Sequence, residues 1–258
     1  MGLKSVTFLG TGTSQGVPVI ACPCAVCHSQ NDKDKRLRTS VFIETDGGNI
    51  NIDAGPDFRQ QMLRENVLEL DAILFTHEHK DHIAGLDDVR AFNFLSKKPM
   101  EIYCTAGVFE GLSREFHYVF NPKFEYPGIP KINKTIITKN SVLNILGNEI
   151  IPIEVMHYKL PVLGYRIGRF AYITDANYIA KEELEKLRGV EVLVLNALRK
   201  EKHISHFTLE EALDVIKKVK PQKAYLTHIS HLMGTHEETE KLLPTNVELA
   251  YDGLKLYF

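Results

Sequence analysis

Residues 76–82 read Thr-His-Glu-His-Lys-Asp-His, and this stretch predicts the architecture of the whole chain. It has the form H-x-H-x-D-H and directly follows the apolar run Ala-Ile-Leu-Phe at residues 72–75. That run is short and rich in strand formers, so we expect a buried strand there. The histidines then lie at the carboxyl end of a strand, where α/β sheets usually bind their ligands. Imidazole and carboxylate are donors that zinc prefers, and four scarce residues at fixed spacing argue against a polar loop rich in histidine by chance.

Three more candidate ligands each follow an expected strand. They are His157 after residues 150–156, Asp175 after residues 170–174, and His228 after residues 222–227. If these strands are neighbours, all the loops open on one edge. Seven side chains then meet there: His77, His79, Asp81, His82, His157, Asp175 and His228. Seven ligands are too many for one tetrahedral zinc, but they suit two metals that share a carboxylate and a water.

A second metal motif lies near the start of the chain, where Cys22, Cys24 and Cys27 form C-x-C-x-x-C. Three thiolates this close can converge on one zinc, although a closed structural site needs a fourth ligand. Either the adjacent His28 or a more distant histidine could supply that fourth ligand. Three unbound thiols are the alternative, and a hydrophilic loop with a proline between two of the cysteines disfavours it.

Composition excludes several classes of protein. The 258 residues are 44% hydrophobic and 25% charged, with a formal net charge of -2, so no basic surface indicates nucleic acid or membrane as a partner. The first apolar run is too short for a signal peptide, and no stretch reaches the roughly 18 to 20 apolar residues that span a bilayer. We therefore expect a cytoplasmic protein, where clustered cysteines indicate metal binding rather than disulfides. We see no linker and expect one domain over residues 1–258.

Apolar periodicity predicts an alternation of strands and helices. Strands are expected at residues 5–9, 40–45, 50–53, 101–104, 190–195, 247–250 and 254–258, with a hairpin at 162–167 and 170–174. Helices are expected at residues 57–64, 84–95, 108–117, 182–188 and 208–219. The last helix has capping-box spacing at Thr208 and Glu211.

Three other features keep two interpretations each. Asp53 either hydrogen-bonds a metal ligand or is a turn residue at a strand end. The proline-rich aromatic segment 118–131 is expected to pack, with a pocket wall or a dimer contact as the alternative. The tetrapeptide His-Ile-Ser-His occurs at 203–206 and again at 228–231, and because the flanking residues differ we interpret the repeat as coincidence.

The H-x-H-x-D-H stretch with the three later ligands resembles the metallo-β-lactamase-fold hydrolases over essentially the full length. The resemblance implies an α/β (α+β) chain folded as a four-layer αβ/βα sandwich, with the site at one edge. It also implies an assignment of the ligands. One metal would be held by His77, His79 and His157, the other by Asp81, His82 and His228, with Asp175 bridging the two.

Within that superfamily, the chain resembles most the PhnP-like cyclic phosphodiesterases. The matching stretches are residues 10–12, 15–18, 227–231 and 251–253 together with the cysteines. The resemblance implies a zinc knuckle at residues 20–28, in which His231 rather than His28 completes a structural zinc with Cys22, Cys24 and Cys27. It also implies two zinc or manganese ions at the active site, with His206 and Asp81 as catalytic residues.

The implied activity is hydrolysis of small phosphodiesters, cyclic ones such as phosphoribosyl 1,2-cyclic phosphate included. The expected partner is such a small molecule, with no membrane and no nucleic acid, and a homodimer is left open. A tRNase Z-like RNA phosphodiesterase is the first alternative. Its tRNA-binding arm is usually inserted between the ligands that match His157 and Asp175, where this chain has only residues 158–174. A PqqB-like metal-binding accessory protein without hydrolase activity is the second alternative.

Overall fold

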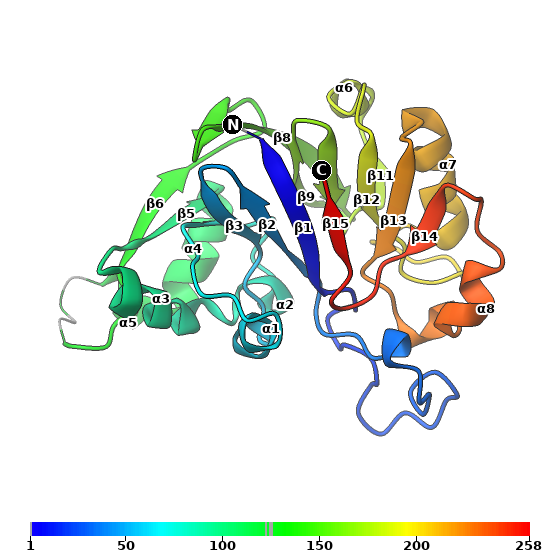
Figure 1. Cartoon of the computed structure of the whole chain (residues 1–258), viewed down its shortest axis with the longest axis horizontal. Coiled ribbons are helices and arrows are strands. Elements are labelled where there is room, and N and C mark those ends of the chain that lie inside the picture. Colours follow the sequence, from blue (N-terminus) through cyan, green and yellow to red (C-terminus); the bar gives the residue numbers. More distant parts are fainter. Residues whose placement is uncertain (1, 122, 124–125) are drawn as a thin grey trace.

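Two β-sheets facing each other form the centre of the computed structural model, which describes residues 2–121, 123 and 126–258 (Figure 1). The first sheet has seven strands in the order β15-β1-β2-β3-β4-β5-β6. Their bounds are β15 Lys255–Tyr257, β1 Leu3–Gly10, β2 Ser40–Thr45, β3 Gly48–Ile52, β4 Ala72–Leu74, β5 Met100–Cys104 and β6 Ile132–Ile136. The two ends of the chain therefore lie side by side, because β1 pairs antiparallel with β15.

The second sheet has eight strands, in the order β11-β8-β9-β10-β12-β13-β14 with β7 paired to β8. Their bounds are β7 Leu143–Ile145, β8 Asn148–His157, β9 Leu160–Ile167, β10 Phe170–Ile173, β11 Tyr178–Ile179, β12 Val192–Asn196, β13 Lys223–Thr227 and β14 Val247–Leu249. The strands β10, β12, β13 and β14 run parallel. Their carboxyl ends therefore meet at one edge of the sheet.

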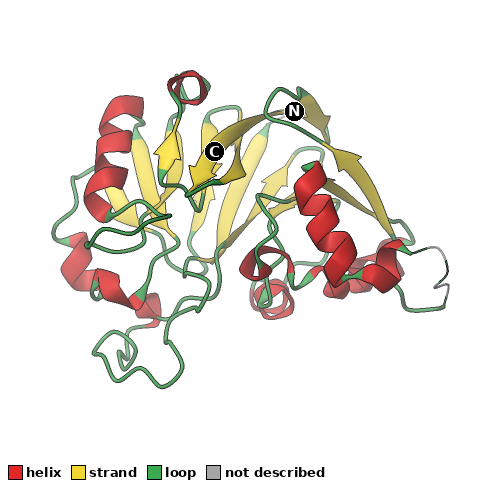
Figure 2. Cartoon of the chain, turned by 180° about the vertical axis from the view of Figure 1, so that it is seen from behind, coloured by secondary structure: helices red, strands yellow, loops and turns green. Residues whose placement is uncertain are grey.

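Helices cover the outer faces of both sheets, as Figure 2 shows from behind. They are α1 Phe58–Arg64, α2 Lys80–Ile83, α3 Arg90–Ser96, α4 Ala106–Glu115, α5 His117–Phe120, α6 Lys181–Glu185, α7 Leu209–Val219 and α8 His236–Glu240, with 3-10 turns η1 Asp32–Asp34, η2 Leu86–Val89 and η3 His231–Met233. The predicted capping box is present, since Thr208 and Glu211 bond each other's backbone N–H groups at the start of α7. No described helix is long and apolar enough to cross a membrane.

Three apolar clusters hold the layers together. One lies between the sheets and contains Phe8, Tyr165 and Tyr172, all fully buried. A second packs α7 against the second sheet, and a third packs α1, α3 and α4 against the first sheet. Helix, sheet, sheet and helix form four layers, so the expected αβ/βα sandwich is confirmed.

Some predicted elements were wrong in detail. The helix expected at residues 84–95 is split into η2 and α3, because Asp88 N–H bonds Gly85 O in a tighter 3-10 turn. The segment 118–131 begins with the end of α5, and β6 and β7 were not predicted. Of that segment, Pro122 and Phe124 lie outside the described residues.

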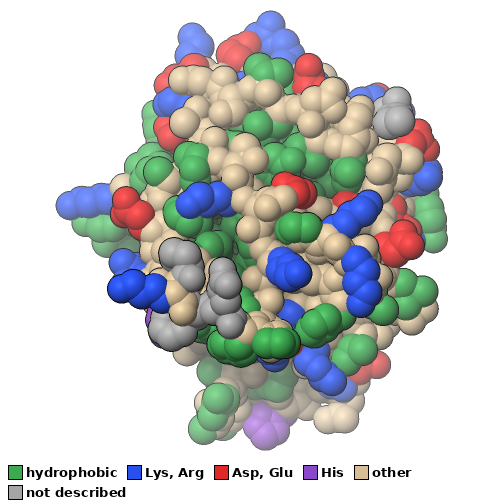
Figure 3. Space-filling model, turned by 90° about the vertical axis from the view of Figure 1, so that its left-hand side faces the viewer, with side chains coloured by type: hydrophobic (Ala, Val, Ile, Leu, Met, Phe, Trp, Pro, Cys, Tyr) green, Lys and Arg blue, Asp and Glu red, His purple; other side chains and the backbone are tan. Residues whose placement is uncertain are grey.

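Part of the segment 118–131 forms the wall of a hollow. Tyr126, Pro127 and Pro130 line it opposite Phe94 of α3, and none of the candidate metal ligands contributes to it. Figure 3 shows this side of the molecule, where Lys and Arg side chains lie among hydrophobic ones. Both interpretations apply to parts of this segment. Tyr118, Val119 and Phe120 pack against the third apolar cluster, as expected, and residues 126–130 form a pocket wall that is separate from the predicted metal site.

Candidate metal centre

The seven predicted ligands come together at the edge where strands of both sheets end. The loop after β4 brings His77, and α2 carries the last ligands of the motif. The second sheet contributes His157 from the end of β8 and single residues after β10 and β13. The strand-end prediction therefore placed every one of these side chains at the correct edge.

Asp175 lies between two histidines at the centre of the site. Its Oδ2 is 3.2 Å from His82 Nε2, and its Oδ1 is 3.2 Å from His228 Nε2. Asp81 Oδ2 is 3.2 Å from His82 Nε2 and 3.8 Å from His228 Nε2. One ligand-capable group is therefore Asp81, His82 and His228, with Asp175 beside it.

The remaining three histidines cluster with one another near Asp175. The ring of His77 is 4.6 Å from that of His79 and 5.8 Å from that of His157, between centroids. His77 also forms a ligand-capable group with His82 and Asp175. His79 is exposed whereas His77 is fully buried, so the site opens to solvent on the side of His79.

The donor atoms of this site fit divalent metal ions. The Nε2 atoms of His77, His82 and His228 are buried and make no hydrogen bond of acceptable geometry among the described residues, although carboxylate oxygens lie 3.2 Å from the Nε2 atoms of His82 and His228. Leaving buried polar atoms without a partner costs roughly 1 to 3 kcal/mol each. Metal ions at these nitrogens remove that cost, and imidazole with carboxylate is a donor set that suits zinc or manganese.

A hydrogen-bonded relay through Asp53 orients two of these histidines. His82 Nδ1 donates to Asp53 Oδ2 over 2.6 Å, and the Thr76 hydroxyl donates to the same oxygen over 2.8 Å. Because the Thr76 proton is used there, His77 Nδ1 donates to Thr76 Oγ1 over 2.9 Å. In the neutral form of each ring the proton is therefore on Nδ1, which leaves Nε2 free to bind a metal. The prediction that Asp53 hydrogen-bonds a candidate ligand is confirmed.

The carboxylates of the site are ionised although they are enclosed. Burial opposes the charge of Asp175, but His228 and His82 hold its pKa well below the ordinary value. Burial also opposes the charge of Asp81, and His82 and His228 lower its pKa overall. Both side chains therefore present anionic oxygens, the form that coordinates metals.

Backbone strain marks the same strand ends. Asp53, Asp175 and His228 have φ of 64°, 54° and 54°, in the left-handed region that non-glycine residues rarely adopt. Tyr158, next to His157, has φ of 59°. Such strained residues cluster at functional sites, where the surrounding structure holds them in place. No pattern in the sequence signalled this strain.

His206 lies beside the ligands without belonging to the predicted seven. Its ring stacks on His228 at 4.8 Å and contacts His157 at 4.5 Å, and its Nδ1 is 3.8 Å from Asp175 Oδ1. His206 lies just before the helix α7, two residues ahead of its N-cap Thr208. Burial and the neighbouring His228 lower the pKa of His206 to about 2, so its imidazole is neutral.

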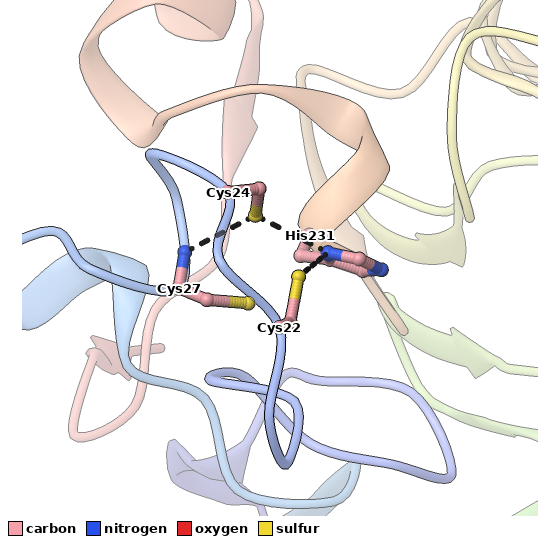
Figure 4. A group of neighbouring side chains, drawn as sticks. All are labelled: Cys22, Cys24, Cys27 and His231. Atoms are coloured by element: carbon pink, nitrogen blue, oxygen red, sulfur yellow. Dashed lines mark hydrogen bonds between the residues drawn. The ribbon is translucent and has the colours of Figure 1, made fainter.

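The cysteine motif forms a separate group of four candidate ligands (Figure 4). His231 Nδ1 lies 3.2 Å from Cys22 Sγ and 3.3 Å from Cys24 Sγ. A hydrogen bond from the Cys27 backbone N–H and one from His231 lower the pKa of Cys24 to about 6. The structure thus brings His231 to the cysteines, whereas His28 is exposed and outside the group.

Comparison with known proteins agrees with this geometry. The chain matches the Beta-lactamase superfamily domain over residues 48–229. It belongs to this superfamily of metallo-β-lactamase-fold hydrolases, which bind divalent metals, and within it to the PhnP family. A crystal structure described as a new diphosphatase from the PhnP family is 40% identical, with a TM-score of 0.92, covering 98% of this chain and 97% of that one.

Other relatives are more distant or larger. An octanoyltransferase of Porphyromonas gingivalis is 41% identical over 250 residues, which are 96% of this chain and 50% of that protein. The chain thus spans about half the length of this curated relative. Zinc-bound PqqB from Methylobacterium extorquens is 19% identical with a TM-score of 0.80, covering 98% of this chain and all of that one. Human short-form tRNase Z is 19% identical with a TM-score of 0.69, covering 98% of each chain. The last two likenesses show a shared fold alone.

Proposed function

We propose that this chain is a phosphodiesterase that hydrolyses small phosphodiesters, cyclic ones such as phosphoribosyl 1,2-cyclic phosphate included. The observation that carries this proposal is that Asp175 lies close to residues of both proposed sets. It groups with His77 and, separately, with His157, and its Oδ1 is 3.2 Å from His228 Nε2. A carboxylate between two sets of histidines suits a pair of metals, which in hydrolases bind phosphoryl oxygens and activate a water between them.

The proposed ligands are those of the predicted assignment. His77, His79 and His157 would hold one ion, Asp81, His82 and His228 the other, with Asp175 between them. Zinc or manganese bound there would neutralise charge on the phosphoryl oxygens and make the attacking water more acidic. Asp53 keeps His82 and, through Thr76, His77 in the orientation that binding requires.

His206 is proposed to act on the leaving oxygen. It is buried beside Asp175 and His228, and a neutral imidazole carries one N–H that can donate a hydrogen bond. A phosphate anion next to the ring favours its protonation, which makes proton donation to the leaving oxygen available. Asp81 is proposed as the second catalytic residue, because its ionised carboxylate lies at the same centre.

A diphosphate is a second candidate substrate. The 40% identical relative is described as a diphosphatase. The α-phosphorus of a nucleoside diphosphate and the phosphorus of a phosphodiester each carry two bridging oxygens. One of these oxygens leaves when water attacks the phosphorus. The same arrangement of ligands and His206 would serve both reactions.

An RNA substrate is disfavoured by the segment between His157 and Asp175. This segment is occupied by β9 and β10, which pair antiparallel as a short hairpin. The hairpin leaves no room in the sequence for an inserted RNA-binding arm. We therefore propose a small molecule as the partner at this site.

The test is a substrate panel for the purified protein after metal analysis. The panel holds bis-aryl phosphate, phosphoribosyl 1,2-cyclic phosphate, 2′,3′- and 3′,5′-cyclic nucleotides, a nucleoside diphosphate, a precursor tRNA, an octanoyl thioester and a β-lactam. Turnover of a small phosphodiester is the expected result. Activity confined to the thioester or the lactam would refute the proposal, and a fully metal-loaded protein inactive on every compound would favour the accessory role.

A further inference from the structure

Three histidine rings form a column that leads from partly exposed surface to the metal centre. The His203 ring stacks on His206 at 5.1 Å with 28° between planes, and His206 stacks on His228 at 4.8 Å with 26°. His203 is only partly buried, whereas His228 is 2% exposed. The repeated tetrapeptide His-Ile-Ser-His supplies both ends of this column, at 203–206 and from 228 onward. His203 belongs to none of the ligand-capable groups of the described residues.

The hydrogen bonds of His203 define which nitrogen carries its proton. The Ser205 backbone N–H, which can only donate, lies 3.3 Å from His203 Nδ1, and the Ser205 hydroxyl lies at the same distance. Nδ1 is therefore the acceptor, so a neutral His203 carries its proton on Nε2. That nitrogen is a donor for an acceptor oxygen brought by a ligand.

The loop that carries His203 is fixed against the metal centre. His157 Nδ1 donates to Ser205 O over 2.8 Å, and Asn177 Nδ2 donates to Ile204 O over 2.9 Å. Arg199 closes the other end of the loop, with its guanidinium donating to the carbonyl oxygens of Glu201 and Lys202 at 3.1 and 2.9 Å. A donor held in this way needs little reorganisation when a ligand binds.

The net positive charge of residues 199–203 favours the binding of an anion. Residues 199–203 carry Arg199, Lys200 and Lys202 against the single carboxylate of Glu201. Lys200 Nζ lies near Gly234, whereas Lys202 is exposed on the same loop as His203. A group with charged oxygens entering beside His206 would therefore meet a hydrogen-bond donor in a positively charged surrounding.

We propose that His203 is a specificity-determining residue whose Nε2–H binds an anionic oxygen on the leaving-group side of the substrate, which favours diphosphates over simple phosphodiesters. This inference rests on the proposed function, in which His206 acts on the leaving oxygen. The leaving group of the substrate is therefore expected to lie beside His206. In the reaction, water adds to the attacked phosphorus and the P–O bond to the leaving phosphate breaks. The leaving oxygen takes the proton that His206 supplies, and His203 stays unchanged.

Two substrates that give the same product test the proposal. Thymidine 5′-diphosphate releases phosphate, and thymidine 5′-(4-nitrophenyl phosphate) releases nitrophenol, while both yield thymidine monophosphate. Replacing His203→Ala should lower kcat/KM for the diphosphate by about 10- to 100-fold, the worth of one hydrogen bond to a charged group. The value for the nitrophenyl ester should change less than about threefold, and metal content should not change. The variant should also bind the non-hydrolysable α,β-methylene diphosphate about 10-fold more weakly.

Two further variants separate a specific donor from other effects. His203→Gln keeps an N–H near the position of Nε2 and should recover part of the lost diphosphate activity. Lys202→Ala removes a charge from the same loop and should lower the diphosphate activity much less than His203→Ala does. Equal losses on both substrates for His203→Ala, or a selective loss of the same size in Lys202→Ala, would overturn the inference.

The wild-type enzyme separates this inference from the proposed function. Turnover of the ester without turnover or binding of the diphosphate refutes the role of His203 and leaves the phosphodiesterase intact. A metal-loaded wild type that turns over neither compound refutes both.

Discussion

Asp53 is the residue on which the orientation of the proposed metal ligands depends. It is fully buried and accepts hydrogen bonds from His82 and from both the N–H and the hydroxyl of Thr76. The sequence placed it at a strand end, but the choice between turn residue and ligand support needed the contacts of β3 with β4. Neighbouring parallel strands that end at the same level bring Asp53 and Thr76 together although they are 23 positions apart.

We expect Asp53→Asn to weaken metal binding by about 10- to 100-fold, the usual worth of a residue that orients a ligand. The amide replaces an acceptor oxygen with a donor, and His82 Nδ1–H then loses its partner or the ring turns. Metal titration followed by calorimetry measures the change. Asp71→Asn serves as control, because Asp71 is exposed and accepts from the backbone of Asn49 away from the site. Equal metal affinities in the wild type, Asp53→Asn and Asp71→Asn would contradict the role of Asp53.

His206→Ala should reduce turnover by about 10² to 10⁴-fold, the usual contribution of a positioned proton donor. Metal content should stay the same, because His206 is not one of the proposed ligands. Steady-state kinetics and metal analysis on one preparation give both values. The exposed His117 provides a matched His→Ala control. Unchanged turnover in His206→Ala would remove this residue from the mechanism.

At the scale of elements, close backbone contacts determine where the metal-binding loop lies. A Cβ at Gly55 would lie 2.0 Å from the Asp81 carbonyl oxygen, which is backbone and cannot swing aside. The next turn is equally tight, since a Cβ at Gly85 would lie 2.2 Å from Gly55 O. The segment after β3 and the helix α2 therefore touch through glycines. This explains why the helix predicted from residue 84 begins instead with a 3-10 turn.

Gly55→Ala should therefore destabilise the fold by about 1 to 3 kcal/mol and displace Asp81 and His82. Denaturant unfolding and metal content report the two effects. Gly107→Ala is the control, because Gly107 lies in α4 with no atom within 4 Å of an added Cβ. That change should be neutral or stabilise by up to about 1 kcal/mol. If Gly55→Ala has the same stability and metal content as the wild type, the backbone near Asp81 can move to accommodate the Cβ, and this prediction is wrong.

The cysteine loop contacts the loop after β13 through His231, whose Nδ1 lies 3.2 Å from Cys22 Sγ and 3.3 Å from Cys24 Sγ. The segment after β1 contacts the same loop, because Ile229 N–H donates to Thr11 O over 2.8 Å. We expect Cys24→Ala to lose one zinc equivalent and to unfold at lower temperature, with activity falling only indirectly. Zinc analysis and calorimetry test this, with His28→Ala as the control that should keep all its metal. An unchanged zinc content in Cys24→Ala would argue against a structural zinc here.

Across the whole molecule, two apolar faces form the sandwich and the candidate metal ligands lie at its rim. The cluster between the sheets contains none of the candidate ligands. The core therefore does not depend on the metal site, although bound metals stabilise the native state by mass action.

Chelation should consequently abolish activity and lower the unfolding temperature without unfolding the protein at 25 °C. Ions present at about 1,000 times their Kd contribute about 4 kcal/mol of stability, which chelation removes. Calorimetry and circular dichroism with and without chelator measure both effects, and adding zinc back should restore them. A chelated protein that has lost its secondary structure would contradict an independent core.

Local patterns were enough to predict much of this protein. The apolar runs and the residues that follow them predicted the four strand ends that carry candidate ligands, and the resemblance of the H-x-H-x-D-H stretch and the later ligands to a known superfamily implied the sandwich. The capping box of α7 was equally visible, because both its residues lie within one turn. Such signals are local, since side chains a few positions apart determine them.

Contacts between distant segments decided the rest. The relay from His77 through Thr76 to Asp53, the approach of His231 to the cysteines, and the left-handed backbone at Asp175 and His228 all depend on which strands are neighbours. The stacking of His203 on His206 and of His206 on His228 brings both copies of the tetrapeptide to the candidate metal centre. Only packing of the two sheets sets these distances, because hydrogen bonds and ring contacts act over a few ångströms while the residues are far apart along the chain.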